Sequence, residues 1–483
     1  MNIAREIISA VARRLDDEIF VENPGMPERR TVSGTEFLRL VREFGAVFGE
    51  HRIGAGTRVA IFLPNSVVFA AVVTALLERD AVFCPVKLEF RASELSSIFA
   101  DFSPDAVVVE QAHIETVAPF LVGRTVLVRS GDALLSAPTL SANPKAAPGR
   151  SVSDGGRIVR VAPEPDGLSD LPASTASVNF TYRGIGYALG AIVPHARYAS
   201  GARTFIECTA SHVARRLLVA LPMSHIFGLI GCVFVPLLYG VTAVIARSLN
   251  PRRVFSVLSS ERIDFFPTIP EILDLLARFA PADPRDSRLT ILATGGSRLT
   301  GHQYTTFRTA FAADVAHGYG LTECTPVSRN VFGSTRAGTI GEIADDIELS
   351  LDPADGEILL RGRDVFSGYY RRAAETQDAR TADGRFRTGD LGLLRDGHLV
   401  FGREKKRTCK VNGLLVDLRE IELVLEQHDS VASASAFFDS GDILVTVEPS
   451  ESGAALPVAE LTEYLRFQIA PYKIPKRISL TRR

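Results

Sequence analysis

The chain has 483 residues, of which 46% are hydrophobic and 23% charged, and its formal net charge is −2. This length exceeds what one hydrophobic core supports and predicts roughly two to four domains of about 100–200 residues each. The near-neutral charge gives no electrostatic basis for nucleic acid or an anionic membrane as the main partner, so we expect a small-molecule partner.

The cysteines and the first residues indicate the cellular compartment. Five cysteines are scattered without the spacing of metal ligands, at Cys84, Cys208, Cys232, Cys324 and Cys409. Their odd number argues against a disulfide framework. Residues 1–20 carry charges every few positions and predict an amphipathic helix, not a signal peptide, and no apolar run reaches membrane-spanning length. We expect a soluble cytoplasmic protein.

Strand and helix patterns alternate from residue 57 onward, which is typical of a parallel α/β sheet. The predicted strands are 57–64, 81–86 and 105–110, and the predicted helices are 66–80 and 91–102. Residues 136–176 are rich in Pro, Ala, Ser and Gly and predict a loop or linker.

A second alternation of strands and helices runs from residue 217 to 320 and predicts a second α/β layer. Short strands and glycine turns follow from about Gly333. From Lys406 a separate small unit is predicted, with helices at 417–428 and 456–470 and strands between them.

The stretch SVNFTYRGIGYALGAIVPH, residues 177–195, has three glycines between an extended segment and a helical one. The N–H groups of Gly184, Gly186 and Gly190 are expected to form an anion-binding concavity, helped by the N-terminus of the following helix. A plain tight turn is the alternative. The stretch matches neither GxxxxGK[ST] nor GxGxxG.

Four further stretches follow in order: LPMSHIFGL (221–229), HGYGLTE (317–323), RTGDLG (387–392) and GREKKRTCKVNG (402–413). Together they resemble motifs of the adenylate-forming enzymes, which include acyl-CoA synthetases, carrier-protein-loading adenylation domains and luciferases. The resemblance covers nearly the whole chain. It implies that ATP and a carboxylic acid give an acyl adenylate and pyrophosphate, after which a second nucleophile takes the acyl group.

The resemblance also implies a two-domain α/β fold. Residues 1–402 are expected to form an N-terminal adenylation domain of two α/β subdomains and a β-rich subdomain. Residues 403–483 are expected to form a small α+β lid that rotates about a hinge near Lys406. Gly413 corresponds to the family position at which the backbone passes along the acceptor channel.

For the nucleotide, the resemblance places Tyr319 against adenine, Thr322 on the α-phosphate and Glu323 on Mg²⁺. These residue types suit the tasks, because a tyrosine offers a flat face and a carboxylate a hard oxygen ligand. Asp390 corresponds to the ribose ligand and Arg403 to an arginine that reaches the ribose or the phosphates. The alternative for Asp390 is an ordinary turn, and the alternative for Arg403 is a surface arginine without a ligand.

The acyl pocket is expected around His225, Phe227 and Gly320. His225 resembles the histidine at the substrate carboxylate and, with Thr322 and Glu323, forms the expected catalytic set. Gly295 and Gly296 match the segment that passes between the adenine and the acyl group.

The glycine stretch departs from the family loop, which reads approximately YTSGTTGxPKG. Aligned on Gly190 and His195, the chain keeps Thr181 and Gly186, whereas Leu189 replaces the lysine. We interpret the stretch as a rebuilt loop that binds the β- and γ-phosphates through backbone amides, including that of Gly184, and through Arg183, whose fork suits phosphate oxygens. Loss of ATP turnover is the alternative.

A second departure concerns the family's catalytic lysine, which follows the run that YKIPKRISLTRR matches. That lysine is expected a few residues beyond Arg483, so either the sequence omits a tail or the protein lacks the lysine. Neither Lys473 nor Lys476 corresponds to it.

The segment FGLIGCVF (227–234) lacks the aspartate that pairs with the ammonium of amino-acid substrates. The expected substrate is therefore a carboxylic acid without an α-amine, in a largely apolar pocket. The family favours a thiol acceptor, from CoA or a carrier protein. An amine or amino acid acceptor, as in coronafacate ligase, and a non-catalytic nucleotide or acyl binder are the alternatives.

Overall fold

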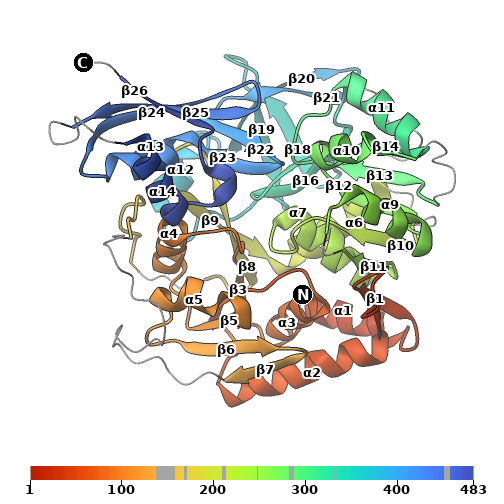
Figure 1. The fold of residues 1–483 in the computed structure, drawn as a ribbon. Coiled ribbons are helices and arrows are strands. Elements are labelled where there is room, and N and C mark those ends of the chain that lie inside the picture. The colour runs from red at the N-terminus through yellow and green to blue at the C-terminus, as the bar shows by residue number, and fades with distance from the viewer. Residues whose placement is uncertain are drawn as a thin grey trace.

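The computed structural model describes residues 2–136, 158–167, 171–208, 214–246, 248–281, 288–330, 333, 336, 338–450 and 457–481 (Figure 1). The first α/β stretch forms a seven-stranded sheet in the order β7-β6-β5-β3-β4-β8-β9. Its strands are β3 (Arg58–Phe62), β4 (Val82–Pro85), β5 (Ala106–Glu110), β6 (Thr125–Ser130), β7 (Ala133–Ser136), β8 (Thr175–Tyr182) and β9 (Ala188–Pro194). The central strands are parallel, and β7 and β9 pair antiparallel at the two edges.

The helices that alternate with these strands are α3 (Val67–Glu78), α4 (Ala92–Phe102) and the short α5 (Ile114–Val117). The alternation predicted for residues 57–110 is therefore confirmed. Most of the predicted linker lies outside the described residues. Its segment 158–167 contains neither helix nor strand.

The second α/β stretch forms another seven-stranded sheet, in the order β14-β13-β12-β10-β11-β1-β2. Its strands are β1 (Glu18–Glu22), β2 (Arg30–Ser33), β10 (Arg216–Val219), β11 (Thr242–Ile245), β12 (Phe265–Thr268), β13 (Ile291–Thr294) and β14 (Asp314–His317). Helices α9 (Pro251–Ser260), α10 (Pro270–Ala277) and α11 (Gly301–Phe311) belong to this part. The helix predicted over residues 1–20 is too long: α1 (Ile3–Ala12) ends early, because the apolar side chains of the next segment join this sheet beside β11.

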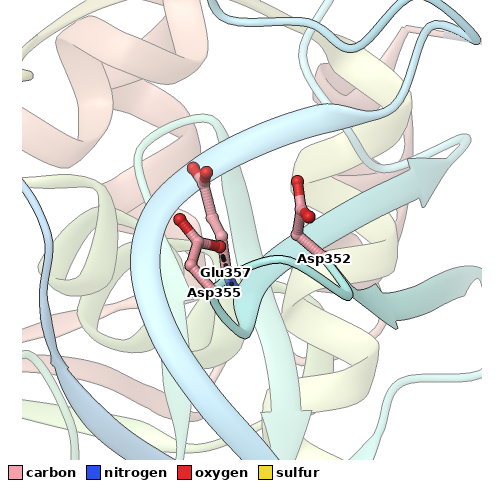
Figure 2. Close-up of side chains that lie close together, drawn as sticks. All are labelled: Asp352, Asp355 and Glu357. Carbon is pink, nitrogen blue, oxygen red and sulfur yellow. Dashed lines mark hydrogen bonds between the residues drawn. The ribbon is translucent and has the colours of Figure 1, made fainter.

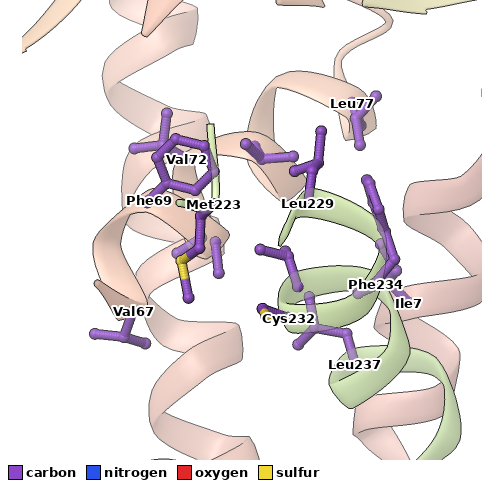
Figure 3. Packing of buried hydrophobic residues seen from close by; sticks show 14 of the residues in the cluster. Ile7, Val67, Phe69, Val72, Leu77, Met223, Leu229, Cys232, Phe234 and Leu237 are labelled. Carbon is purple, nitrogen blue, oxygen red and sulfur yellow. The ribbon is translucent and has the colours of Figure 1, made fainter. Parts of the chain in front are cut away.

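A layer of helices and their buried side chains joins the two sheets. It contains α1, α2 (Gly34–Glu50), α3, α6 (His195–Cys208), α7 (Ile226–Gly228), the π-helical turn η3 (Leu229–Phe234) and α8 (Val235–Tyr239). Figure 3 shows Phe69 and Val72 of α3, in the first α/β stretch, beside Met223 and Leu229 of the second α/β stretch. All four side chains are fully or almost fully buried. The two α/β stretches therefore share one hydrophobic core.

The β-rich part follows. It consists of β15 (Tyr319–Leu321), β16 (Cys324–Arg329), β17 (Glu342–Ile343), β18 (Ile347–Leu351), β19 (Glu357–Gly362), β20 (Phe386–Arg395), β21 (His398–Glu404) and helix α12 (Ala373–Asp378). Strands β18 to β21 form one antiparallel sheet.

Residues 408–450 and 457–481, here called the C-terminal lobe, form the small unit drawn in blue in Figure 1. Its elements are the hairpin β22 (Thr408–Val411) and β23 (Leu414–Asp417), α13 (Leu418–Glu426), β24 (Val431–Asp439), β25 (Asp442–Pro449), α14 (Val458–Gln468) and β26 (Arg477–Leu480). The lobe has a core of its own, which Val159 of the linker joins. The α/β class and the β-rich and α+β parts are confirmed, whereas the boundary at 402/403 and the hinge at Lys406 stay predictions.

Two further observations concern the described residues. Cys84, Cys232, Cys324 and Cys409 are buried free thiols, and the side chain of Cys208 lies outside the described part. None of the described helices is long and apolar enough to cross a membrane.

Candidate functional site

A cavity of about 730 Å³ lies where the carboxyl ends of β13 and β14 meet the β-rich part and the C-terminal lobe. Carboxyl ends of parallel strands are the usual place for ligands in α/β folds. Most of the predicted site residues line this cavity: Thr181, His225, Phe227, Gly295, Gly296, Tyr319, Gly320, Thr322, Glu323, Asp390, Lys406 and Gly413. Arg183, Gly184, Gly186 and Arg403 do not line it.

Tyr319 and Asp390 form one pair in this cavity. The hydroxyl of Tyr319 donates a hydrogen bond of 2.6 Å to Oδ2 of Asp390, and burial raises the pKa of Tyr319, so that the hydroxyl keeps its proton. The ring of Phe401 lies 6.1 Å from that of Tyr319, and Nζ of Lys406 lies 3.9 Å from Oδ1 of Asp390. An aromatic face thus lies beside an oriented carboxylate, and a nucleoside can use both.

Glu323 is buried in the turn between β15 and β16, with 2% of its surface exposed. Its Oε1 accepts a hydrogen bond of 2.6 Å from the hydroxyl of Tyr369 and lies 3.8 Å from Nη1 of Arg183. The guanidinium of Arg183 donates to the carbonyl of Arg387 at 2.8 Å and packs on Phe386. Arg183 therefore lies next to Glu323 and outside the cavity lining, and its binding of phosphate stays a prediction.

The glycine loop connects two antiparallel strands, β8 and β9, and α6 begins only after β9. The expectation that a helix N-terminus directly follows the loop is therefore wrong, because residues 188–194 pair with β8 as a strand. The N–H of Gly186 donates to Oδ2 of Asp417 at 3.0 Å. A side chain at Gly184 would lie 2.8 Å from the backbone nitrogen of Arg407. The C-terminal lobe thus covers the loop.

His225 lies at the start of α7, where its Nδ1 accepts a hydrogen bond of 3.3 Å from the N–H of Phe227. Burial and the ammonium groups of Lys87 and Lys410 together lower the pKa of His225 to about 3. The imidazole is therefore neutral at physiological pH. Asn65 holds the preceding segment by accepting from the N–H of Met223 at 2.7 Å.

The region beside His225 is apolar. The rings of Phe227 and Phe205 meet edge to face with their centres 5.7 Å apart. A side chain at Gly295 would lie 3.5 Å from the ring of Phe227, so a glycine leaves this space open. Such surroundings suit the hydrocarbon part of an acid.

The tip of the hairpin β22–β23 packs against the rim of the cavity. Gly413 has φ +73°, and a side chain there would meet Ile269 at 2.3 Å. The carbonyl of Gly413 also approaches Gly296. This close approach requires a glycine, and the acceptor-channel role of Gly413 stays a prediction.

Several residues that line the cavity were not predicted from the sequence, namely Lys87, Phe205, Phe401, Glu404 and Lys410. Neighbouring side chains of a strand point to opposite faces, so Glu404 lines the cavity while Arg403 is exposed. A contact of Arg403 with ribose or phosphate stays a prediction. The chain has seven lysines, and three of them, Lys87, Lys406 and Lys410, line the cavity.

Asp352, Asp355 and Glu357 form a carboxylate group outside the cavity lining (Figure 2). Nζ of Lys405 lies 2.5 Å from Asp355, and Nη1 of Arg387 lies 3.0 Å from Glu357. The protein's own cations thus neutralise this group, and we interpret it as an ion-pair network.

Comparison with known proteins identifies an AMP-forming acid ligase of the adenylate-forming superfamily. Residues 8–370 match the family model described as AMP-binding enzyme, and the chain belongs to this family. Acyl-CoA synthetase ALT10 of Alternaria alternata is 25% identical, over 87% of this chain and 84% of that protein.

Solved structures show the same fold over the whole chain. The amide bond synthetase McbA of Marinactinospora thermotolerans is similar with a TM-score of 0.82 at 21% identity, over 100% of this chain and 96% of that chain. The o-succinylbenzoate CoA synthetase MenE of Bacillus subtilis is similar with a TM-score of 0.80 at 18% identity, over 99% and 94% of the two chains.

Proposed function

We propose that the protein uses ATP to convert a carboxylic acid without an α-amine into an acyl adenylate and pyrophosphate, and then transfers the acyl group to a thiol. The observation that carries this proposal is the arrangement in one cavity of the Tyr319–Asp390 pair, the buried carboxylate of Glu323 and the apolar wall beside His225. These groups supply an aromatic face, a sugar-binding carboxylate, an anionic metal ligand and a hydrocarbon pocket.

Each residue has a defined task in this proposal. Tyr319 stacks on the adenine, Asp390 accepts hydrogen bonds from the ribose and Thr322 donates to the α-phosphate. Glu323 would hold Mg²⁺, which prefers carboxylate oxygen and would supply neutralising charge at the phosphates. Neutral His225 lies beside the substrate carboxylate and adds no charge of its own.

The family of acyl-CoA synthetases, including the relative from Alternaria, favours the thiol acceptor. One observation supports an amine acceptor as the second candidate: the fold is similar over the whole chain to that of an amide bond synthetase. In both cases the acyl adenylate is the shared intermediate. The cytoplasmic location stays a prediction.

The test incubates the full-length protein with ATP, Mg²⁺ and pooled aliphatic and aromatic acids, and detects acyl-AMP by mass spectrometry. The proposal predicts acyl-AMP from at least one acid. CoA and amines are then added separately, and the one that consumes the acyl-AMP identifies the acceptor. ATP binding without acyl-AMP from any acid would favour the non-catalytic binder instead.

A further inference from the structure

Two lysines without an acidic partner line the cavity beside His225. Lys87 follows β4 and is 8% exposed, and Lys410 lies on β22 of the C-terminal lobe. Within the described part of the chain, neither ammonium has a carboxylate at ion-pair distance. The contact recorded for the ammonium of Lys87 is with the ring of Phe90, whose centre lies 5.4 Å away.

Two acidic residues raise the pKa of Lys87: Glu89, which is exposed, and Glu94, which is buried and has a partner of its own. Nζ of Lys473 lies 5.5 Å from the centre of the same Phe90 ring. Lys473 binds Glu94 and Glu420, each at 2.5 Å. These two carboxylates make their direct contacts with Lys473, and neither lies at ion-pair distance from Lys87.

A buried ammonium without a counter-ion is costly, and a second ammonium in the same cavity increases that cost. Burial, together with the charges of Lys473 and Lys410, lowers the pKa of Lys87 to about 8, although Glu89 and Glu94 act to raise it. The charges of Lys87 and Lys410 also lower the pKa of His225. Both lysines line the cavity, where an anionic ligand can neutralise their charge.

We propose that Lys87 and Lys410 bind a carboxylate other than the one that is activated. This inference rests on the proposed function, in which the acid is activated beside His225. Two sources have this chemistry: the acid, as a dicarboxylic acid, or the acceptor, as an amino acid. The phosphates of CoA lie a whole pantetheine arm away from its thiol and do not reach this position when the thiol attacks.

The two lysines come from different parts of the fold, which has a consequence for binding. Lys87 belongs to the N-terminal sheet region, and Lys410 belongs to the hairpin of the lobe. A carboxylate between them contacts both parts, so ligands that carry it bind most tightly when the hairpin lies over the cavity. Charge-assisted hydrogen bonds are about twice as strong as neutral ones and provide the selectivity.

The test measures binding by calorimetry in the presence of AMP, without turnover. The acid arm compares malonate, succinate and adipate with the monocarboxylic acids of equal carbon number. The acceptor arm compares alanine with alaninamide. The variants are Lys87→Gln, Lys410→Gln and the charge-keeping Lys87→Arg, with Lys476→Gln as the control, because Lys476 is exposed and pairs with Asp442.

We expect wild type to bind the carboxylate-bearing member of one arm about tenfold more tightly or better, as charged hydrogen bonds imply. The arm that shows the preference identifies the source. Lys87→Gln and Lys410→Gln remove most of the preference, whereas Lys87→Arg and Lys476→Gln retain it. If the wild type binds the ligands with and without the extra carboxylate equally tightly in both arms, the inference is wrong. It is also wrong if Lys87→Gln weakens the binding of both members of a pair by the same factor. Because turnover is not used, a protein that makes no acyl-AMP still tests this site.

Discussion

The ammonium of Lys473 lies 2.5 Å from the carboxylate of Glu94, although Glu94 belongs to α4 and Lys473 to the C-terminal lobe. Glu420 of the lobe lies at the same distance, and the ammonium also contacts the hydroxyl and the ring of Tyr182. The side chains of Lys473 and Glu94 are 0% exposed. This buried cluster fixes the lobe against the glycine loop and α4.

Replacing Lys473 by Met leaves two buried carboxylates without their cation. Breaking a buried ion pair in this way costs about 3–5 kcal/mol, which is the expected loss in the free energy of unfolding by denaturant. The control is Lys476→Met, because the ion pair of Lys476 with Asp442 is exposed and such pairs contribute about 0–1 kcal/mol. Equal losses in the two variants would show that the cluster does not stabilise the lobe.

The contact between lobe and loop depends on Gly186. Its φ is +96°, and a side chain there would meet Leu423 at 2.3 Å. Gly186→Ala is expected to weaken this contact by about 1–3 kcal/mol through overpacking and to accelerate amide hydrogen exchange of residues 184–187 about tenfold. Gly441→Ala is the matched control, because φ is +91° there but nothing lies within 4 Å. Similar rates of amide hydrogen exchange at residues 184–187 in both variants would show that the packing of the lobe on the loop does not depend on Gly186.

The hydrogen bond from Tyr319 to Asp390 orients the proposed ribose ligand. Tyr319→Phe keeps the ring but removes this bond to a charged group, which is worth about 1.5–3 kcal/mol. We expect KM for ATP to rise about tenfold or more in steady-state kinetics, while the KM for the acid changes little. Tyr304→Phe, on α11 and outside the cavity lining, is the control. An unchanged KM for ATP would show that the hydrogen bond from Tyr319 to Asp390 does not contribute to nucleotide binding.

His225 makes stability depend on pH. Burial holds its pKa at about 3, whereas an unfolded histidine titrates near pH 6.5. As the pH falls below 6.5, the unfolded state binds a proton that the folded state does not, so the free energy of unfolding decreases. His225→Gln cannot titrate and is expected to lose about 1.4 kcal/mol less than wild type between pH 7.5 and 5.5. Denaturant titrations at the two pH values measure this difference, and parallel losses would indicate a solvated imidazole.

The sequence predicted the α/β alternation well, because mostly apolar runs such as residues 58–62 and 67–78 have the lengths typical of a buried strand and a buried helix. Most of the site residues that it predicted line the cavity, because the motifs around Tyr319, Glu323 and Asp390 are local in the chain. Long-range contacts were missed. Nothing in the local pattern indicates that Lys87 lies near Lys410, or that Asp417 accepts a hydrogen bond from Gly186.

Two errors arise from pairing between distant parts of the chain. The first helix was predicted too long, because the pattern of residues 13–20 does not reveal that Phe20 belongs to a strand that pairs with β11. The glycine loop was expected to lead into a helix, but residues 188–194 form β9, since they pair with β8. In both cases tertiary pairing overrides the local signal.

The central claim is that Glu323 and the surrounding cavity catalyse adenylation. Isotope exchange between pyrophosphate and ATP, dependent on an acid that yields acyl-AMP, measures this step directly in the wild type, Glu323→Gln and the control Glu348→Gln, at an exposed position of β18. We expect exchange in the wild type and in Glu348→Gln, and a loss of about 100-fold or more in Glu323→Gln, because the proposed metal ligand loses its charge. Wild-type exchange that persists unchanged in Glu323→Gln would contradict the central claim.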